Sequence, residues 1–167
     1  GVIPGMLDKY TIGNRPAGVW MPRFYNVDGQ TAPFLRGFSY EGSASRANWT
    51  EGASMPGYGA ALKQRLREYG PWTFGFYGFL ECLPYRENSL SLDPVRKDKW
   101  GIPILNTRFE WGQNERALAK QMVRDASEML ESAGATNISL PPEELPPGGF
   151  GIHEMGTARM GRDPKTS

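Results

Sequence analysis

The sequence is poor in the residues that build disulfide bridges and metal centres. Cys82 is the single cysteine and His153 the single histidine among 167 residues. An intrachain disulfide is therefore excluded. A zinc or iron site built from this chain alone is disfavoured, because such sites draw on several cysteine or histidine ligands.

Blocks of one charge and long apolar runs are also missing. The chain has 19 basic and 18 acidic residues, which give a net charge of +1. Nothing in this balance favours a nucleic acid or an anionic membrane as partner. No stretch approaches the roughly 18 apolar residues of a membrane span, and no signal-peptide pattern opens the chain. Cytoplasm or periplasm is favoured, without a decision between them.

Glycine, proline and aromatic residues are abundant instead. The 21 glycines and 14 prolines make up about a fifth of the chain, and 12% of the residues are aromatic. The combined share of glycine and proline exceeds average usage but stays below the ~25–30% that indicates disorder. We therefore expect a folded chain with many turns. Because 167 residues suit one domain better than two, and because Gly1 replaces an initiator methionine, we expect residues 1–167 to be a single domain excised from a longer chain.

Hydrophobic patterning predicts an α+β domain, with a largely antiparallel sheet and helices packed on one side of it. The segment 72–82 is apolar on both faces and is expected to be a central strand covered on each side, with residues 88–92 as its partner. Further strands are expected over 19–25, with Pro22 marking an edge or a bulge, and over 34–41 and 102–109; a short helix is expected over 59–69.

The clearest predicted helix spans residues 114–133. Asn114 is its expected N-cap, Glu115 complements the helix dipole, and Gly134 ends it. One face carries an apolar stripe that predicts packing against the sheet, formed by Leu118, Met122, Ala126, Met129, Leu130 and Ala133.

Three patterns suggest chemistry that the rest of the sequence does not support. Gly57 and Gly59 open a helix as in a dinucleotide-binding turn, but the third glycine is missing and no hydrophobic strand precedes them. A Ser39–His153 hydrolase pair would need an orienting carboxylate that the sequence cannot place. Cys82 lies at the end of an apolar strand segment, where a buried thiol would be inert toward His153.

The segment around His153 is the most informative part of the sequence. His153, Gly156, Thr157, Met160 and Gly161 follow the spacing His-x-x-Gly-Thr-x-x-Met-Gly. This pattern resembles the catalytic-histidine segment of the glucose–methanol–choline (GMC) flavoprotein oxidoreductases. The likeness extends back to about residue 79. The sequence of the motif is most similar to that of the pyranose-oxidase-like branch of the family.

The resemblance implies a function. It implies the substrate domain of an FAD-dependent enzyme that oxidises a sugar or another alcohol by hydride transfer to the flavin. His153 matches the family's catalytic base, and Gly156 and Thr157 match flavin-proximal positions. Imidazole suits the role because its ordinary pKa, near 6.5, leaves it partly neutral at working pH.

The resemblance also implies partners, and it leaves one alternative open. The Gly-x-Gly-x-x-Gly of the nucleotide-binding half is absent, as is the segment with the family's second active-site residue. FAD would therefore be held mainly by the remainder of the parent chain, and this chain alone is expected to be inactive. The alternative is a non-catalytic carbohydrate-binding or interaction module. In either case Trp20, Trp49, Trp72 and Trp111 could line a carbohydrate surface.

Overall fold

The computed structural model describes residues 1–4, 18–22, 25–46, 55–67, 71–149, 151–153, 156 and 161–165. These residues form the predicted α+β fold. Its elements, in chain order, are Val2–Ile3 (β1), Val19–Met21 (β2), Phe38–Arg46 (β3), Gly59–Arg67 (α1), Trp72–Leu80 (β4), Ser89–Lys97 (β5), Pro103–Arg108 (β6) and Gln113–Ser132 (α2).

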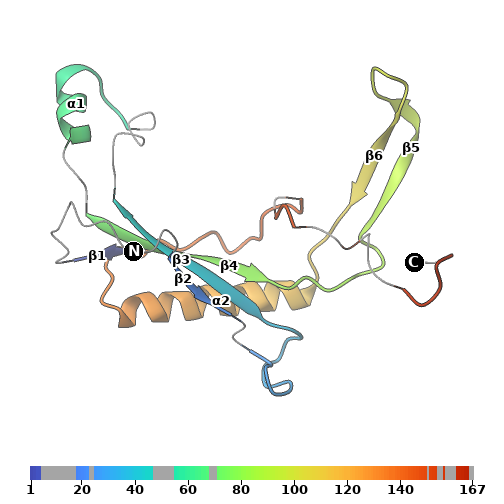
Figure 1. Ribbon diagram of the computed structural model, residues 1–167, viewed down its shortest axis with the longest axis horizontal. Coiled ribbons are helices and arrows are strands. Elements are labelled where there is room, and N and C mark those ends of the chain that lie inside the picture. Colours follow the sequence, from blue (N-terminus) through green and yellow to red (C-terminus); the bar gives the residue numbers. More distant parts are fainter. Residues whose placement is uncertain are drawn as a thin grey trace.

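The strands form two antiparallel sheets. A four-stranded sheet has the order β1-β4-β3-β2, and β5 and β6 form a separate hairpin. Figure 1 shows α2 lying along one face of the four-stranded sheet, while the hairpin projects away from that body. The predicted antiparallel architecture with helical cover on one side is confirmed. So is the edge position of β2, which ends directly before Pro22.

Large and small side chains alternate across β3 and β4 on the face that α2 covers. Tyr40 lies opposite Gly78, and Phe76 lies opposite Gly42. Gly78 lets the helix approach closely, because a Cβ atom there would lie only 2.3 Å from the sulfur of Met122. The fully buried Tyr40 donates a hydrogen bond from its hydroxyl to the Met122 carbonyl oxygen at 2.6 Å. Burial raises the pKa of this phenol, so the donor proton is retained at neutral pH.

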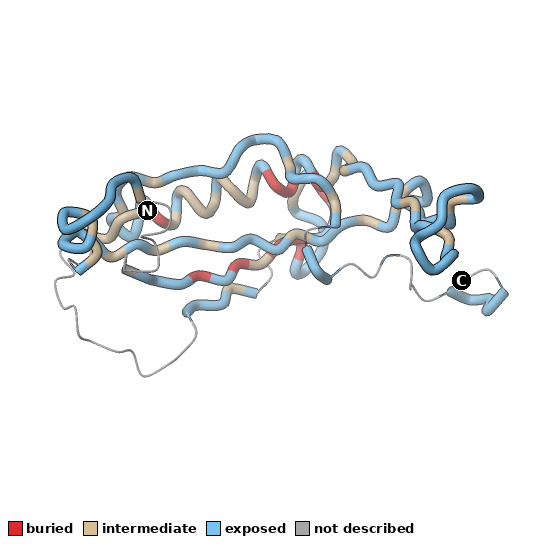
Figure 2. Tube along the Cα trace, turned by 90° about the horizontal axis from the view of Figure 1, so that it is seen from above, coloured by how far each residue is buried: buried red, intermediate tan, exposed pale blue. Residues whose placement is uncertain are grey.

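The hydrophobic core is a single layer between the sheet and α2. Phe34, Phe38, Tyr40 and Leu118 form its buried centre. Figure 2 shows the buried positions gathered between the helix and the sheet, with the hairpin and the connecting segments largely exposed. Partly buried side chains extend the layer, namely Met21, Tyr25, Ala32, Phe76, Leu80, Met122, Ala126 and Met129. The predicted packing stripe of α2 is thus confirmed except at Ala133, which is exposed.

A polar side chain shapes the loop that brings Phe34 into this core. Asn26 is 8% exposed and adopts a left-handed backbone conformation with φ of 56°. Its amide nitrogen donates to the carbonyl oxygen of Phe34 at 2.9 Å, and its amide oxygen accepts from Thr31 N at 2.7 Å. Asparagine tolerates this conformation better than most residues, and its side chain can replace missing backbone hydrogen bonds.

The start of α2 differs from the prediction. Gly112 is the N-cap, and the carboxylate of Glu115 accepts a hydrogen bond from Gly112 N at 3.0 Å. Asn114 is inside the helix and instead exchanges two hydrogen bonds with the backbone of Leu35, at 2.7 and 3.2 Å. The predicted end is correct, because Gly134 follows the C-cap with φ of 77°.

Two strand predictions are wrong. Residues 89–92 pair with β6 rather than with β4, because the chain reverses within residues 98–102 and forms a local hairpin. The strand β4 is central, but α2 covers only one of its faces, so Tyr77 is 70% and Phe79 44% exposed on the other. The strand β3 also begins four residues later than expected, because residues 34–37 belong to the loop that Asn26 organises.

The helix α1 lies apart from the core. It spans Gly59–Arg67 and has no buried residue, although Leu62 and Leu66 are half-buried. The last residues of the predicted helix, 68–69, lie outside the described part of the chain. Neither α1 nor α2, the helices of the described residues, is long and apolar enough to span a membrane.

Replacement of Leu118 tests the packing of α2. Leu118 is 0% exposed, so we expect Leu118→Ala to lower the free energy of unfolding by about 2–5 kcal/mol through lost burial and a residual cavity. Urea unfolding followed by circular dichroism would measure the loss. Leu92→Ala is a matched control, because Leu92 is 64% exposed and its truncation should change stability by about 0.5 kcal/mol or less. Equal unfolding midpoints for the two variants would contradict the assignment.

Candidate active site

The candidate base, His153, lies on an exposed segment beyond α2. Ile152, directly before it, is 84% exposed and has a left-handed φ of 54°. This conformation is strained for a β-branched residue, and such strain concentrates at functional sites. Gly156 is also exposed, and a Cβ atom built there would meet no atom of the described residues within 4 Å. Thr157, the other predicted flavin-proximal residue, lies outside the described residues.

The chain reaches His153 by a return path along the body. After α2, Val2 and Thr136 exchange backbone hydrogen bonds of 2.7 and 2.8 Å, which attach this part of the chain to β1. The following segment then runs back toward the hairpin end of the molecule (Figure 1).

Two aromatic residues hold this return segment where it passes the start of α2. The indole Nε1 of Trp111 donates a hydrogen bond to the Pro146 carbonyl oxygen at 2.7 Å. The ring of Phe109 lies against Gly148 so closely that a Cβ atom there would be 2.2 Å from ring atom Cδ1. The two rings meet edge to face, with centroids 4.7 Å apart. They line a groove of about 600 Å³ together with the proline-rich segment and with Glu110, Arg116 and Glu144.

Glu115 fixes the backbone beneath this groove. The side chain is fully buried, and its two oxygens accept hydrogen bonds from Leu83 N at 2.9 Å and from Gly112 N at 3.0 Å. Hydrogen bonds to a charged acceptor are stronger than neutral ones, which offsets part of the cost of burying the carboxylate. Burial is the main cause that raises the pKa of the neighbouring Tyr85 phenol, and the hydrogen bond between Tyr85 and Glu115 raises it further.

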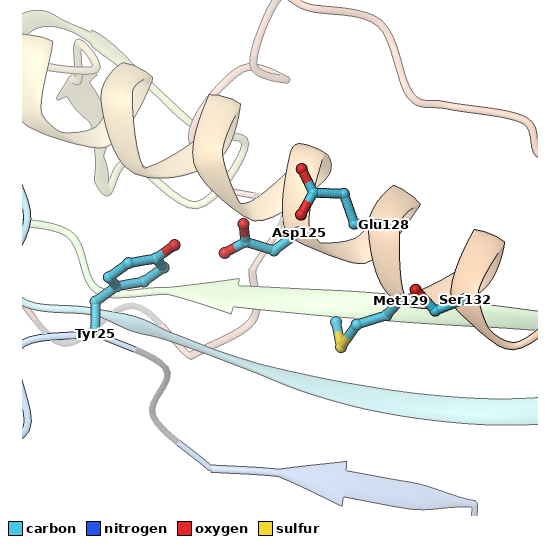
Figure 3. Close-up of a pocket in the computed structure, with 5 residues that line it drawn as sticks. All are labelled: Tyr25, Asp125, Glu128, Met129 and Ser132. Atoms are coloured by element: carbon cyan, nitrogen blue, oxygen red, sulfur yellow. The ribbon is translucent and has the colours of Figure 1, made fainter.

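A second groove lies on the other half of α2. Figure 3 shows Tyr25 facing Asp125 across it, with Glu128, Met129 and Ser132 continuing along the helix. Its volume is about 450 Å³. Burial first, and then the hydrogen bond and charge of Asp125, raise the pKa of Tyr25. His153 lines neither of these two grooves.

The tryptophans predicted as a carbohydrate surface do not share one. Trp20 is 65% exposed on the sheet face opposite α2, in the same row as Glu41 and Tyr77. Trp72 belongs to the face that α2 covers, and Trp111 lies in the groove with Pro146. Trp49 lies outside the described residues. The three described tryptophans therefore do not form one carbohydrate surface.

The prediction of a buried Cys82 is wrong. Its side chain is exposed and lies beyond the end of β4, and its thiol donates a hydrogen bond to the Leu83 carbonyl oxygen at 3.5 Å. Partial burial of the sulfur is the main cause that raises the pKa of the Cys82 thiol, and the charge of Glu115 raises it further. Among the described residues, no cluster of three or more histidine, cysteine, aspartate or glutamate side chains is arranged to hold a metal ion.

Comparison with known proteins identifies the family. Residues 84–167, half of the chain, match the family model described as GMC oxidoreductase. The chain belongs to the GMC oxidoreductase family. The matched residues contain the β5–β6 hairpin, α2, the aromatic groove and the complete histidine pattern of this family member.

Two curated relatives agree with this assignment. A 2-methyl-1,2-propanediol dehydrogenase from Mycolicibacterium austroafricanum is 31% identical over 156 residues, which cover 90% of this chain and 28% of the relative. A gluconate 2-dehydrogenase flavoprotein from Pantoea cypripedii is 33% identical over 95 residues, covering 50% and 14% respectively. The GMC chain thus spans less than a third of either relative. No solved structure matches it. Neither relative bears on the pyranose-oxidase-like branch, which stays a prediction.

The sequence did not indicate the parts played by Glu115 and Trp111. The sequence predicts only that Glu115 complements the helix dipole and that Trp111 could line a carbohydrate surface. A glutamate three residues after a helix N-cap is a recognised capping pattern. The capping role of Glu115 could therefore be predicted once the N-cap is placed at Gly112. No local signal reveals the hydrogen bond of Trp111, because its partner Pro146 is 35 residues away.

The reactivity of Cys82 tests this geometry. Because its pKa is raised, its thiolate fraction near neutral pH is smaller than that of free cysteine, whose pKa is roughly 8.5. We expect the rate of alkylation by iodoacetamide to rise with pH with a midpoint above that of a free cysteine peptide measured alongside. Glu115→Gln should lower that midpoint by removing the nearby negative charge. A midpoint at or below the peptide value would show that the sulfur is not partly buried.

Proposed function

We propose that the chain is the substrate domain of an FAD-dependent dehydrogenase or oxidase that oxidises a small sugar or another alcohol at a CH–OH group. The observation that carries the proposal is the His153-x-x-Gly156-Thr157 pattern inside the segment that matches the family. Residues 1–167 form one such domain in this proposal, and the remainder of the parent chain supplies the nucleotide-binding domain.

His153 acts as the base in the proposed reaction. Bound flavin supplies an acceptor for the hydride that leaves the carbinol carbon. The hydroxyl proton must leave as well, and a neutral imidazole can take it when it lies within hydrogen-bonding distance of that oxygen. Exposure of His153 is compatible with this role, because the imidazole can reach a substrate held against another domain.

The residues present fit only the reactive side of FAD. Gly156 has open space where a side chain would be, so the backbone there can pass close to a flat ring, and Thr157 follows it. The diphosphate of FAD ordinarily needs free backbone N–H groups at a helix N-terminus. At the first turn of α2 the carboxylate of Glu115 already occupies such a position. We therefore propose that the remainder of the parent chain binds the diphosphate.

The relatives favour a small polyol as substrate. One is named for 2-methyl-1,2-propanediol and the other for gluconate, and both compounds carry hydroxyl groups on adjacent carbon atoms. We extend this common chemistry to the present chain, with a diol, a sugar or a sugar acid as the substrate class.

Replacement of His153 tests the base role directly. In the complete flavoprotein, His153→Ala should leave the flavin bound and slow its reduction by substrate by about 10²–10⁴-fold. Stopped-flow absorbance under anaerobic conditions measures this step. A matched control is Lys165→Ala, an exposed residue of the same terminal segment that should change the rate less than about twofold. A His153→Ala rate within about threefold of the parent would exclude the base role.

The isolated 167-residue chain tests where the cofactor is bound. We expect no tight FAD binding and no alcohol oxidation, since the diphosphate site lies elsewhere and only one side of the flavin ring would be contacted. Titration with FAD, monitored by flavin fluorescence, measures FAD binding. An assay with polyols and a dye acceptor measures alcohol oxidation. Sub-micromolar binding or measurable turnover would contradict this division of the cofactor site. Binding of a sugar without any turnover would instead favour the alternative of a non-catalytic binding module.

A further inference from the structure

The β5–β6 hairpin has one apolar face that the chain leaves exposed. In an antiparallel pair, directly opposite residues share a face, and successive residues of a strand alternate between the two faces. The register pairs Leu90 with Thr107 and Leu92 with Leu105, so the three leucines lie on one face. We call these three residues the leucine face. Leu90, Leu92 and Leu105 are 43%, 64% and 54% exposed, respectively.

The opposite face is closed by hydrogen bonds within the hairpin. The carboxylate of Asp93 accepts from the backbone N–H of Val95 at 2.9 Å and of Arg96 at 2.7 Å. It also accepts from Arg96 Nε at 2.7 Å, and a terminal nitrogen of the same guanidinium donates to the amide oxygen of Asn106 at 3.0 Å. The polar face therefore supplies its own partners, whereas the leucine face has none of comparable extent.

The turn of the hairpin is fixed by a side chain as well. The carboxylate of Asp98 accepts from the backbone N–H groups of Trp100 and Ile102, both at 2.9 Å. Gly101 has a φ of 85°, which glycine adopts without strain. An isolated two-stranded hairpin is marginally stable in water, so these bonds preserve a shape that the leucine face alone would not. A preformed element loses little conformational entropy when it binds, which suits the hairpin to docking.

Basic side chains lie at the tip of the hairpin. Lys97 and Lys99 form no salt bridge within the part of the chain that the structure describes. The ammonium group of Lys99 lies 4.2 Å from the ring centroid of Trp100, which is 74% exposed. Asp93 and Asp98, the acidic residues nearby, are already occupied by the hydrogen bonds given above. A complementary surface would be apolar opposite the leucines and acidic opposite the tip.

We propose that the leucine face docks onto the remainder of the parent chain, at an apolar surface bordered by carboxylates. The proposal rests on the function proposed above, which makes this chain one domain of a longer enzyme. The two relatives have ample length for such a surface, because this chain covers only 28% and 14% of them. The hairpin projects from the body formed by α2 and the four-stranded sheet (Figure 1), so it can reach a second domain without disturbing the core.

Two neighbouring substitutions test the docking. Leu92→Asn places an amide on the leucine face, and Ser91→Asn, the matched control, places the same amide on the opposite face. In the 167-residue chain, both should leave the melting temperature within about 1 °C of the parent value, because both positions are exposed. In the complete flavoprotein, Leu92→Asn should lower the melting temperature by at least about 3 °C through lost apolar burial, and Ser91→Asn should not.

Hydrogen exchange gives a second measurement that needs no substitution. Amides of residues 89–92 should exchange at least about tenfold more slowly in the complete flavoprotein than in the 167-residue chain, because docking suppresses local opening of the hairpin. Lys99→Glu tests the acidic border. It should lower the melting temperature of the complete flavoprotein at low salt and do so less at high salt, since salt screens exposed charges. An unchanged melting temperature at low salt would overturn the acidic border.

The remaining outcomes separate the docking from its alternatives. An unchanged melting temperature for Leu92→Asn in the complete flavoprotein, or an equal loss in both proteins, would overturn the docking. Dimers that dissociate in Leu92→Asn would assign the leucine face to a second copy and overturn it too. If the Leu92→Asn flavoprotein does not fold, equal hydrogen exchange in the two unsubstituted proteins would overturn it. The proposed function fails independently, through a parent-like rate of flavin reduction in His153→Ala.

Discussion

The close approach of α2 to the four-stranded sheet is the interaction on which the rest of the structure depends. It is possible because Gly78 leaves room for Met122, while Tyr40 on the neighbouring strand fills the adjacent space and bonds to the backbone of the helix. A side chain at position 78 would separate the two layers. Leu118 would then lose its cover, and the small core has few other buried side chains to compensate.

The first turn of α2 connects this packing to the candidate active site. Three polar side chains near it bind backbone groups from distant parts of the chain. Glu115 holds Leu83, Asn114 holds Leu35, and Asn88 holds Glu110. The loop beneath the core, the end of β4 and the link that bears Trp111 therefore converge on one helix terminus. This convergence explains how residues 141–149, which contain no helix or strand, can have a defined starting point.

The described surface carries several large apolar side chains. Trp20, Tyr77 and Phe79 are exposed on the open sheet face, and Leu90, Leu92 and Leu105 lie on one side of the hairpin with exposed fractions from 43% to 64%. Exposed apolar surfaces of this kind mark contacts with other protein or ligand. They agree with the proposal that the remainder of a longer GMC enzyme completes the site.

The sequence by itself determined the fold class, the helix α2 with its stop at Gly134, and the family. These rest on local periodicity, on a residue that tolerates positive φ, and on a contiguous motif. Only the tertiary structure decided which strands pair, which face of β4 is covered, and what Glu115, Asn114 and Trp111 bind. The hydrogen bonds of Glu115 with Leu83, of Asn114 with Leu35 and of Trp111 with Pro146 join residues that are 32 to 79 positions apart. Such contacts leave no periodic trace, because a hydrogen bond to a backbone carbonyl or amide requires no particular residue type at the far end.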